Sequence, residues 1–348
     1  MAPVNPCGVA AEHAVGSEPG GGRTVRTRPR PTCPLCGQPG RVRHERLRDL
    51  LYGVDGLWTL RECPSAGCGL MWLDPIPVPE DVPLLYVRYY THRAAAGHRT
   101  SLRDSLYKVY RGAHSILAGF TGLGREIRLI RGAGLEDLPA GKVFDVGCGD
   151  GVFLQAMRMR GWEVEGCEVD AGAAGLAREK GLVVHTGDFA ALDLTQGAYD
   201  AVTLHHVVEH LPDPRPVFEK ARQMLRPGGR LVIVMPNTRS LGHDRFGRCW
   251  RGLEPPRHFC LYHPDLLARL AREAGYGIRL CLSSAAHADV ILGASLSLAE
   301  ARGRPVSDPP PVSLVRTLRA LALQLAEHRL IRKGHGCGEE CLLVAEKL

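Results

Sequence analysis

The stretch from residue 142 to 151, Lys-Val-Phe-Asp-Val-Gly-Cys-Gly-Asp-Gly, constrains the fold of this chain more than any other. An apolar run leads straight into glycines at every second position, and a helix-like run at 152–157 follows. Glycine permits positive φ angles and a close approach of the backbone to a ligand. A strand, a glycine loop and a helix in this order therefore predict a cofactor held at a helix N-terminus.

The spacing of these glycines distinguishes between kinds of cofactor loop. A dinucleotide fingerprint, G-x-G-x-x-G, would need a glycine at position 152, where Val152 stands, and the Gly-Lys-Ser/Thr of a phosphate-binding loop is absent here. The pattern that remains, Asp145-x-Gly147-x-Gly149-x-Gly151, resembles motif I of the class I S-adenosylmethionine (SAM) methyltransferases. The resemblance implies that these four residues lie against bound SAM.

Later segments are similar, in the same order, to the other SAM-contacting segments of that family. An acid about twenty residues past the glycines commonly holds a nucleotide ribose, which indicates Glu168, with Asp170 as the alternative. Asp188 and Phe189 match the position that contacts adenine, and His205 matches the loop under the donor sulfonium. Taken singly, an aspartate at a strand end or in a Gly-Asp turn could equally be a cap.

The order of these segments implies a Rossmann-like α/β fold. The resemblance predicts a seven-stranded, mostly parallel sheet whose last strand, at 341–346, runs antiparallel. We assign residues 136–348 to this SAM-dependent methyltransferase domain, with a helical insertion at about 300–335. Apolar residues at helical spacing within 99–131 favour helices, so residues 76–135 are interpreted as a linker and a helical cap.

The first 31 residues are rich in glycine, proline and arginine. The arginines between Arg23 and Arg30 have no acids among them and could contact nucleic acid or anionic lipid. A disordered tail is the favoured interpretation, because such segments bury too little apolar surface to fold. The formal net charge of the whole chain is a modest +7.

The spacing of the cysteines predicts a metal site. Cys33 and Cys36 form a C-x2-C pair, Cys63 and Cys68 form a C-x4-C pair, and a glycine follows each pair. Four thiolates can close a tetrahedron around Zn²⁺ and leave no open position, so we expect a structural zinc ribbon over residues 32–75. We expect this ribbon to be stabilised separately from the methyltransferase domain.

The ribbon and the SAM core together resemble a narrower group. A Cys-Pro-x-Cys-Gly knuckle at 33–37 and the segment C-G-L-x-W-L-x-P at 68–75 precede the core. This arrangement is similar to the bacterial zinc-ribbon methyltransferases that modify small molecules or saccharides. The resemblance implies transfer of a methyl group to an O or N atom of a small molecule or glycan.

Methyl transfer from a sulfonium is an in-line displacement, so the enzyme mainly has to hold donor and acceptor aligned. A hydroxyl acceptor also needs a general base, and histidine titrates near neutrality. Open α/β sheets bind ligands beyond the carboxyl ends of their strands. The candidates there are His206, Glu209 and His210 after the fourth strand and His258 after the fifth. We favour His210, although Glu209 and His210 could instead brace a helix. Three upstream tyrosines are further candidates for the base: Tyr86, Tyr89 and Tyr90.

Two other functions are compatible with the sequence. An RNA methyltransferase could use the ribbon and the basic tail for RNA recognition, although His205-His206 stands where a base-methylating enzyme carries an Asn-Pro-Pro-Tyr-like motif. A non-catalytic SAM-binding interaction protein is the third possibility. No run approaches 18 apolar residues and the chain does not open on a basic segment followed by an apolar one, so we expect a cytoplasmic protein without a membrane partner.

Overall fold

The computed structural model describes residues 24–87, 102–307 and 313–348. Two of the tyrosines proposed as alternative bases, Tyr89 and Tyr90, lie outside the described residues. None of the described helices combines the length and the apolar composition that a membrane crossing requires.

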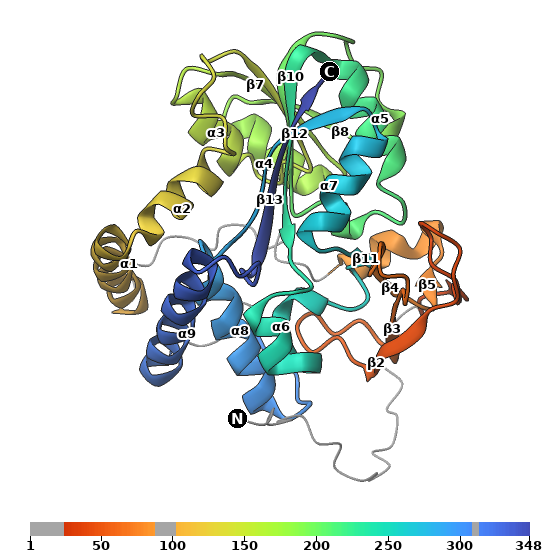
Figure 1. Cartoon of the computed structure of the whole chain (residues 1–348), viewed down its shortest axis with the longest axis vertical. Helices are drawn as coiled ribbons and strands as arrows, with labels where there is room; N and C mark the ends of the chain where they lie inside the picture. The colour runs from red at the N-terminus through yellow and green to blue at the C-terminus, as the bar shows by residue number, and fades with distance from the viewer. Residues whose placement is uncertain (1–23, 88–101, 308–312) are drawn as a thin grey trace.

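Seven strands form the central sheet, in the spatial order β12-β13-β10-β9-β6-β7-β8 (Figure 1). In chain order they are β6 (Lys142–Val146), β7 (Glu163–Glu168), β8 (Val183–Thr186), β9 (Tyr199–His205), β10 (Leu225–Pro236), β12 (Tyr276–Ser284) and β13 (Glu340–Lys347). β13 is antiparallel to both of its neighbours, β10 and β12, whereas β10, β9, β6, β7 and β8 are mutually parallel. The predicted Rossmann-like sheet with an antiparallel last strand is confirmed.

Helices cover both faces of this sheet because its central strands are apolar on both sides. Val143 and Phe144, which are consecutive in β6, and Ala201 and Val202, which are consecutive in β9, point to opposite faces and are all buried, as expected for parallel strands that are covered twice. The covering helices are α3 (Val152–Arg158) and α4 (Ala171–Glu179), which pack on β7 and β8, and α5 (Arg215–Met224) and α7 (Pro264–Glu273), which pack on β10 and β12.

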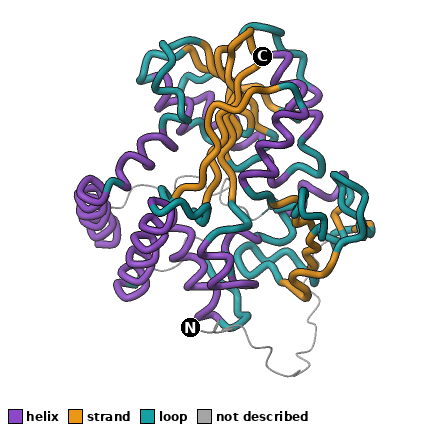
Figure 2. The backbone as a smooth tube through the Cα atoms, in the orientation of Figure 1, coloured by secondary structure: helices purple, strands orange, loops and turns teal. Residues whose placement is uncertain are grey.

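A second group of helices lies beyond the end of β10, below the sheet in Figure 2. It contains α1 (Leu102–Thr121), α6 (Leu241–Phe246), α8 (Ala288–Ala301) and α9 (Leu314–Arg332), while α2 (Leu123–Arg131) leads from α1 to the side of the sheet and packs against it (Figure 1). Helix α8 packs against both α6 and α9. Between β12 and β13 the helical structure therefore begins at Ala288, earlier than the residue near 300 that the sequence pattern indicates.

The ribbon shares its sheet with the methyltransferase part of the chain. Its strands β2 (Arg41–Leu47), β3 (Trp58–Glu62) and β4 (Met71–Leu73) are completed by β11 (Cys260–Leu261), in the order β11-β4-β3-β2. β11 pairs antiparallel with β4, placing Cys260 opposite Trp72. The expectation of separately stabilised modules is wrong, because a main-chain ladder joins them.

Apolar packing reinforces this connection. Leu60 and Leu73 of the ribbon belong to the same buried cluster as Trp250 and, from α8, Leu292 and Leu296. A continuous core therefore runs from the ribbon into the helical layer below the sheet.

The predicted disordered tail is wrong for its last residues, 24–31. Strand β1 (Thr27–Arg28) pairs antiparallel with β5 (Ile76–Pro77). The Arg26 guanidinium donates to the Asp81 carboxylate at 2.8 Å, and the backbone N–H of Arg30 donates to Asp74. These acids lie about fifty residues further along the chain. Local composition therefore could not reveal them.

Candidate functional site

The glycine loop between β6 and α3 adopts the backbone conformation that its sequence indicates. Gly147, Gly149 and Gly151 have φ angles of 69°, 55° and 81°, all in the left-handed region. A Cβ atom on Gly147 would lie 2.7 Å from Val207, and one on Gly151 would lie 2.2 Å from Leu182. A Cβ on Gly149 would meet no atom within 4 Å. Gly147 and Gly151 are therefore required by packing, whereas Gly149 borders open space in which a ligand could lie.

Polar side chains at the carboxyl ends of β6 and β9 face this loop. Asp145 is 2% exposed and accepts a hydrogen bond of 2.6 Å from the Thr203 hydroxyl. The His205 ring packs on Phe153 with 4.3 Å between centroids, and its Nδ1 lies 3.5 Å from Asp145 Oδ1. Both His205 ring nitrogens are buried and have no hydrogen-bond partner among the described residues. Such unpaired groups are costly unless a ligand satisfies them.

Glu168 ends β7 with its carboxylate on the glycine loop. One oxygen accepts from the Gly149 N–H and the other from the Asp170 N–H, both at 2.9 Å. Asp170, the alternative ribose ligand, caps helix α4 by accepting from the Ala173 N–H. Glu168 therefore lies directly on the glycine loop whereas Asp170 serves the helix cap, and the contact of either carboxylate with a ribose stays a prediction.

The predicted adenine contacts have packing or capping roles in the described structure. Asp188 accepts from the Ala190 N–H and caps the short 3₁₀ helix η3 (Phe189–Ala191). The Phe189 side chain is buried, with its ring 5.9 Å from the Phe144 ring and a Lys220 ammonium 5.2 Å from its centroid. The proposed contact of both residues with adenine stays a prediction.

SAM fits this group of residues. Gly149 leaves room beside the loop, the Glu168 carboxylate accepts from the Gly149 N–H, and His205 at the end of β9 has two ring nitrogens without a hydrogen-bond partner among the described residues. SAM, when bound, supplies an electrophilic methyl group on a sulfonium sulfur. The residues that would hold it are Asp145, Gly147, Gly149, Gly151, Glu168 and His205.

His206, the next residue after β9, has a positive φ of 54°. Its Nδ1 lies 3.3 Å from Glu209 Oε1 and its Nε2 lies 3.0 Å from Glu340 Oε1. Partial desolvation works against the charged side chain, which is 46% exposed, but hydrogen bonds to the two carboxylates outweigh it and raise the pKa of His206 to about 10. A charged imidazole with both nitrogens bonded cannot accept a proton near neutral pH. The geometry thus disfavours His206 as the general base.

One of the two carboxylates that hold His206, that of Glu340, was not among the residues indicated by the sequence. Glu340 begins β13, is 1% exposed, and also accepts from His287 Nδ1 at 3.0 Å. The charged histidines lower the pKa of Glu340 despite its burial. Only the pairing of β13 with β10 brings Glu340 beside the loop after β9, so no local pattern could have identified it.

His210 is held in a defined orientation at the end of the same loop. Its Nδ1 lies 3.1 Å from the Arg257 carbonyl oxygen and 3.1 Å from the Tyr86 hydroxyl. A carbonyl only accepts, so a hydrogen bond to Arg257 requires the hydrogen on Nδ1, with the Tyr86 hydroxyl as a second acceptor, and Nε2 is then the nitrogen free to accept a proton. No hydrogen bond to this Nε2 occurs within the described part of the chain. This tautomer is the one that a general base requires.

His258 and Glu209 lie next to His210. The two imidazole rings meet edge to face with 4.9 Å between centroids, and His258 Nδ1 donates to the Gly252 carbonyl at 2.8 Å. Burial lowers the pKa of His258 to about 4, so the ring is neutral. Glu209 is fully buried, and its Oε2 has no hydrogen-bond partner among the described residues.

One ligand atom each of Glu209, His210 and His258 lies within 4.8 Å of the others. Two imidazoles and a carboxylate at this spacing can share a proton or hold a divalent cation. All four predicted catalytic residues, His206, Glu209, His210 and His258, are therefore brought together.

The four predicted zinc ligands also come together. Cys33 Sγ lies 3.7 Å from Cys68 Sγ, Cys36 Sγ lies 3.4 Å from Cys63 Sγ, and all four sulfurs lie within 4.8 Å of one another. A tetrahedron with Zn–S bonds of about 2.3 Å has S···S edges of about 3.8 Å, which matches this spacing. The donor set therefore fits a structural zinc ion, which Cys33, Cys36, Cys63 and Cys68 would hold.

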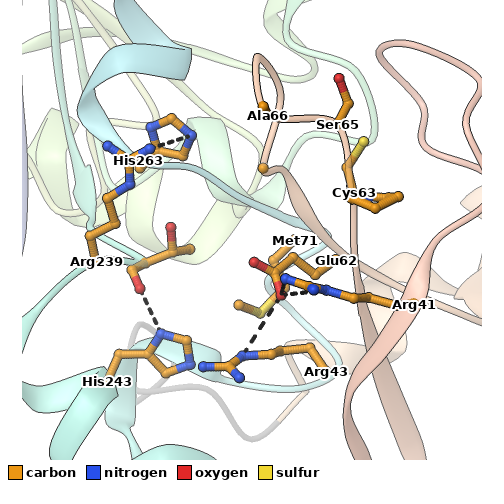
Figure 3. A pocket seen from close by; sticks show the side chains of 13 residues that line it. Arg41, Arg43, Glu62, Cys63, Ser65, Ala66, Met71, Arg239, His243 and His263 are labelled. Atoms are coloured by element: carbon orange, nitrogen blue, oxygen red, sulfur yellow. Dashed lines mark hydrogen bonds and ion pairs between the residues drawn. The ribbon is translucent and has the colours of Figure 1, made fainter.

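A polar cavity of about 230 Å³ lies between the second knuckle and the loop after β10 (Figure 3). Arg41, Arg43 and Glu62 line it from the ribbon, and Arg239, His243 and His263 line it from the methyltransferase side. Beside it, His44 Nε2 lies 2.9 Å from His243 Nε2, while His243 Nδ1 donates to the Thr238 carbonyl. Burial lowers the pKa of His44 to about 3, so this pair stays neutral and joins the two parts through a hydrogen bond.

Comparison with known proteins agrees with this geometry. Residues 123–279 match a family model described as a methyltransferase domain. The ubiquinone biosynthesis O-methyltransferase of Chromobacterium violaceum is 31% identical over 153 residues, which cover 40% of this chain and 65% of that protein. The protein of the same name from Pseudomonas syringae pv. tomato is 38% identical over 110 residues, covering 29% of this chain and 47% of that protein. The chain thus spans less than two thirds of the length of these relatives.

Solved structures include two partial matches. A possible histamine N-methyltransferase from Thermotoga maritima is 18% identical, with a TM-score of 0.44 over 69% of this chain and 96% of that chain. The [4+2]-cyclase SpnF is 22% identical, with a TM-score of 0.43 over 64% of this chain and 80% of that chain. The sequence matches, together with the sheet topology, identify a SAM-dependent methyltransferase domain in this chain.

Gly149 provides a test of the SAM site. Gly149→Ala places a Cβ in the open space beside the loop, where the ligand would lie, so the affinity for SAM should fall about tenfold or more, because overpacking by one methyl group costs about 1–3 kcal/mol. Gly175→Ala in α4 is the matched control, because its Cβ meets no atom and its φ is not left-handed. Calorimetric titration with S-adenosylhomocysteine measures both. Equal affinities for the two variants would show that the ligand lies elsewhere.

The zinc site can be tested by elemental analysis. The purified chain should contain about one zinc per molecule, and Cys33→Ser/Cys36→Ser should contain none, because two thiolates cannot complete the tetrahedron. Since β4 pairs with β11, loss of the metal should also lower the melting temperature of the methyltransferase domain. Cys281→Ser, outside the cluster, is the control. Zinc retained at full occupancy in the double variant would exclude this site.

His206 makes the stability of the fold depend on pH. The pKa of His206 in the folded protein, about 10, exceeds the ordinary value of about 6.5. The contribution of His206 to the free energy of unfolding is therefore fully present below pH 6.5 and is lost as the pH rises toward 10. The difference in unfolding free energy between the wild type and His206→Gln should be constant at low pH and shrink across that interval. Urea denaturation at several pH values measures it, with His335→Gln, an exposed histidine, as the control. A difference that does not change with pH would contradict a charged His206.

Proposed function

We propose that this protein is a SAM-dependent O-methyltransferase that transfers a methyl group to a hydroxyl group of a small molecule. The observation that carries the proposal is the orientation of His210, whose Nδ1–H faces the Arg257 carbonyl and whose Nε2 is left to accept a proton. The relatives named above are O-methyltransferases, which supports an oxygen acceptor.

The chemistry divides between the cofactor and the protein. The acceptor oxygen attacks the methyl carbon while the carbon–sulfur bond breaks, and the products are the methyl ether and S-adenosylhomocysteine. The hydroxyl proton passes to His210 Nε2, because an alcohol that keeps its hydroxyl proton is a poor nucleophile. Glu209 lies within 4.8 Å of the reacting imidazole and would stabilise the imidazolium that forms.

The neighbouring histidines support the same assignment by elimination. His206 is already charged through its two carboxylate partners, and His258 is buried with a depressed pKa that makes it a weak base. Of the three described histidines His206, His210 and His258, His210 is the one that is partly exposed and keeps a ring nitrogen without a hydrogen-bond partner. His258 and Glu209 would then position His210 and balance its charge.

A glycan acceptor, or an RNA acceptor recognised by the ribbon, draws no support from the relatives, whose printed names concern ubiquinone biosynthesis. A non-catalytic SAM-binding role would not explain why His210 is oriented with Nδ1 on the Arg257 carbonyl. We therefore retain small-molecule O-methylation as the proposed activity.

The test is a single-turnover assay with radiolabelled SAM and a panel of catechol, phenol, a primary alcohol and an imidazole. Methyl transfer to a hydroxyl member is expected, and His210→Gln should lower that rate by about 10²- to 10⁴-fold without changing the affinity for SAM. His335→Gln, on the surface, is the control. Transfer to the imidazole alone, or an unchanged rate in His210→Gln, would refute the proposal. A last measurement uses a variant that lacks Cys33 and Cys36. If a chelator abolishes the activity of this variant and a divalent cation restores it, Glu209, His210 and His258 bind a metal instead.

A further inference from the structure

The ribbon loop between β2 and β3 reaches the catalytic side of the molecule. In this loop the Asp49 carboxylate accepts from the backbone N–H groups of Leu51, Tyr52 and Val54 at 3.0–3.1 Å. These bonds within the loop fix the direction of the Asp49 carboxylate independently of the rest of the protein. Asp49 is nevertheless buried, with 1% of its side chain exposed.

The partner of Asp49 is Arg257, which belongs to the methyltransferase part of the chain. Arg257 Nη1 donates to Asp49 Oδ2 at 2.8 Å and to the Leu85 carbonyl at 3.2 Å, and Nε donates to Glu254 Oε1 at 3.0 Å. The guanidinium lies over the Tyr52 ring, 4.4 Å from its centroid, and none of the Arg257 side chain is exposed. A buried cation is tolerable only with such partners, so Arg257 can occupy this position only when the ribbon loop is in place.

Arg257 lies in a turn that also carries two groups of the candidate site. Its carbonyl oxygen accepts from His210 Nδ1, and His258 follows it directly. At the start of the turn, Glu254 has a left-handed backbone with φ 31° and ψ 54°, a conformation that L residues rarely adopt. The ion pairs of Glu254 with Arg251 and Arg257 hold this strained turn in place.

We propose that Asp49 of the ribbon is a positioning residue for methyl transfer, acting through Arg257 to fix the tautomer and orientation of His210. In this arrangement the ribbon loop holds the residue whose carbonyl orients His210. The ribbon thereby becomes part of the catalytic apparatus in addition to any metal-dependent folding role. The inference rests on the proposed function for its effect on rate, but its effect on His210 can be observed independently.

The experiment uses the full-length, zinc-loaded protein bound to S-adenosylhomocysteine. Nitrogen-15 NMR of the histidine side chains reports the tautomer of each ring, and His210→Gln assigns the His210 resonances. The wild type should show His210 protonated at Nδ1, and Asp49→Asn should convert it to a mixture of tautomers. Arg248→Gln is the matched control, because Arg248 also bonds the ribbon, through the carbonyls of Glu45 and Arg46, without contacting Asp49 or Arg257.

The rate of methyl transfer gives the second measurement, using the hydroxyl acceptor that turns over in the panel. Asp49→Asn should lower kcat about 10²-fold, the usual cost of a misplaced catalytic group, while the KM for SAM stays unchanged. Asp49→Asn/Arg257→Met removes both members of the buried pair and should recover the melting temperature but not the rate. If the double variant recovers both, the pair is merely structural and the inference is overturned.

Unchanged His210 resonances in Asp49→Asn would also overturn the inference, whatever happens to the rate. Failure of the proposed function gives a different result. In that case His210→Gln would leave turnover intact, while Asp49→Asn would still alter the His210 resonances. The positioning of His210 by the ribbon would then stand and only the identity of the base would be wrong.

Discussion

The burial of the Arg257 guanidinium is the constraint on which the arrangement of this molecule depends. A cation without exposed surface must be paired, and its partners come from separate segments: Asp49 in the ribbon, the Leu85 carbonyl in the following turn, and Glu254. Each segment is therefore fixed relative to the others. Pairing of β4 with β11 and the shared apolar core have the same effect through main-chain bonds and packing.

This connection changes how the ribbon should be understood. A small module with its own metal is ordinarily regarded as an appendage that folds on its metal and contacts a partner. Here β11, from the methyltransferase part, completes the sheet of the ribbon, and the loop that carries Asp49 packs beside the turn at 254–258. The four cysteines would thus stabilise one boundary of the candidate site as well as the ribbon itself.

Electrostatics separates three histidines that are equivalent in chemical type. His206 lies between two buried carboxylates and is charged, whereas burial keeps His258 neutral although Glu254 and Glu209 lie nearby. His210 is oriented by a carbonyl and keeps one nitrogen available. These differences arise from partners such as Glu340 and Arg257, which are distant in sequence from the loop after β9. The same residue type therefore occurs within one site as a charged side chain, as a buried neutral one and as a partly exposed one held by a carbonyl.

The sequence by itself determined the fold class and the location of the cofactor loop, because both depend on local patterns. The sequence shows three such patterns without reference to any long-range contact: apolar runs of strand length, the glycines at 147, 149 and 151, and the paired cysteines. The predicted sheet topology is confirmed. Tertiary structure alone decided the rest. Whether residues 24–31 are ordered depends on Asp74 and Asp81, and whether the ribbon is separate depends on β11. The protonation state of each histidine depends on charges that the fold brings close, since a pKa responds to neighbours in space, whatever their separation along the chain.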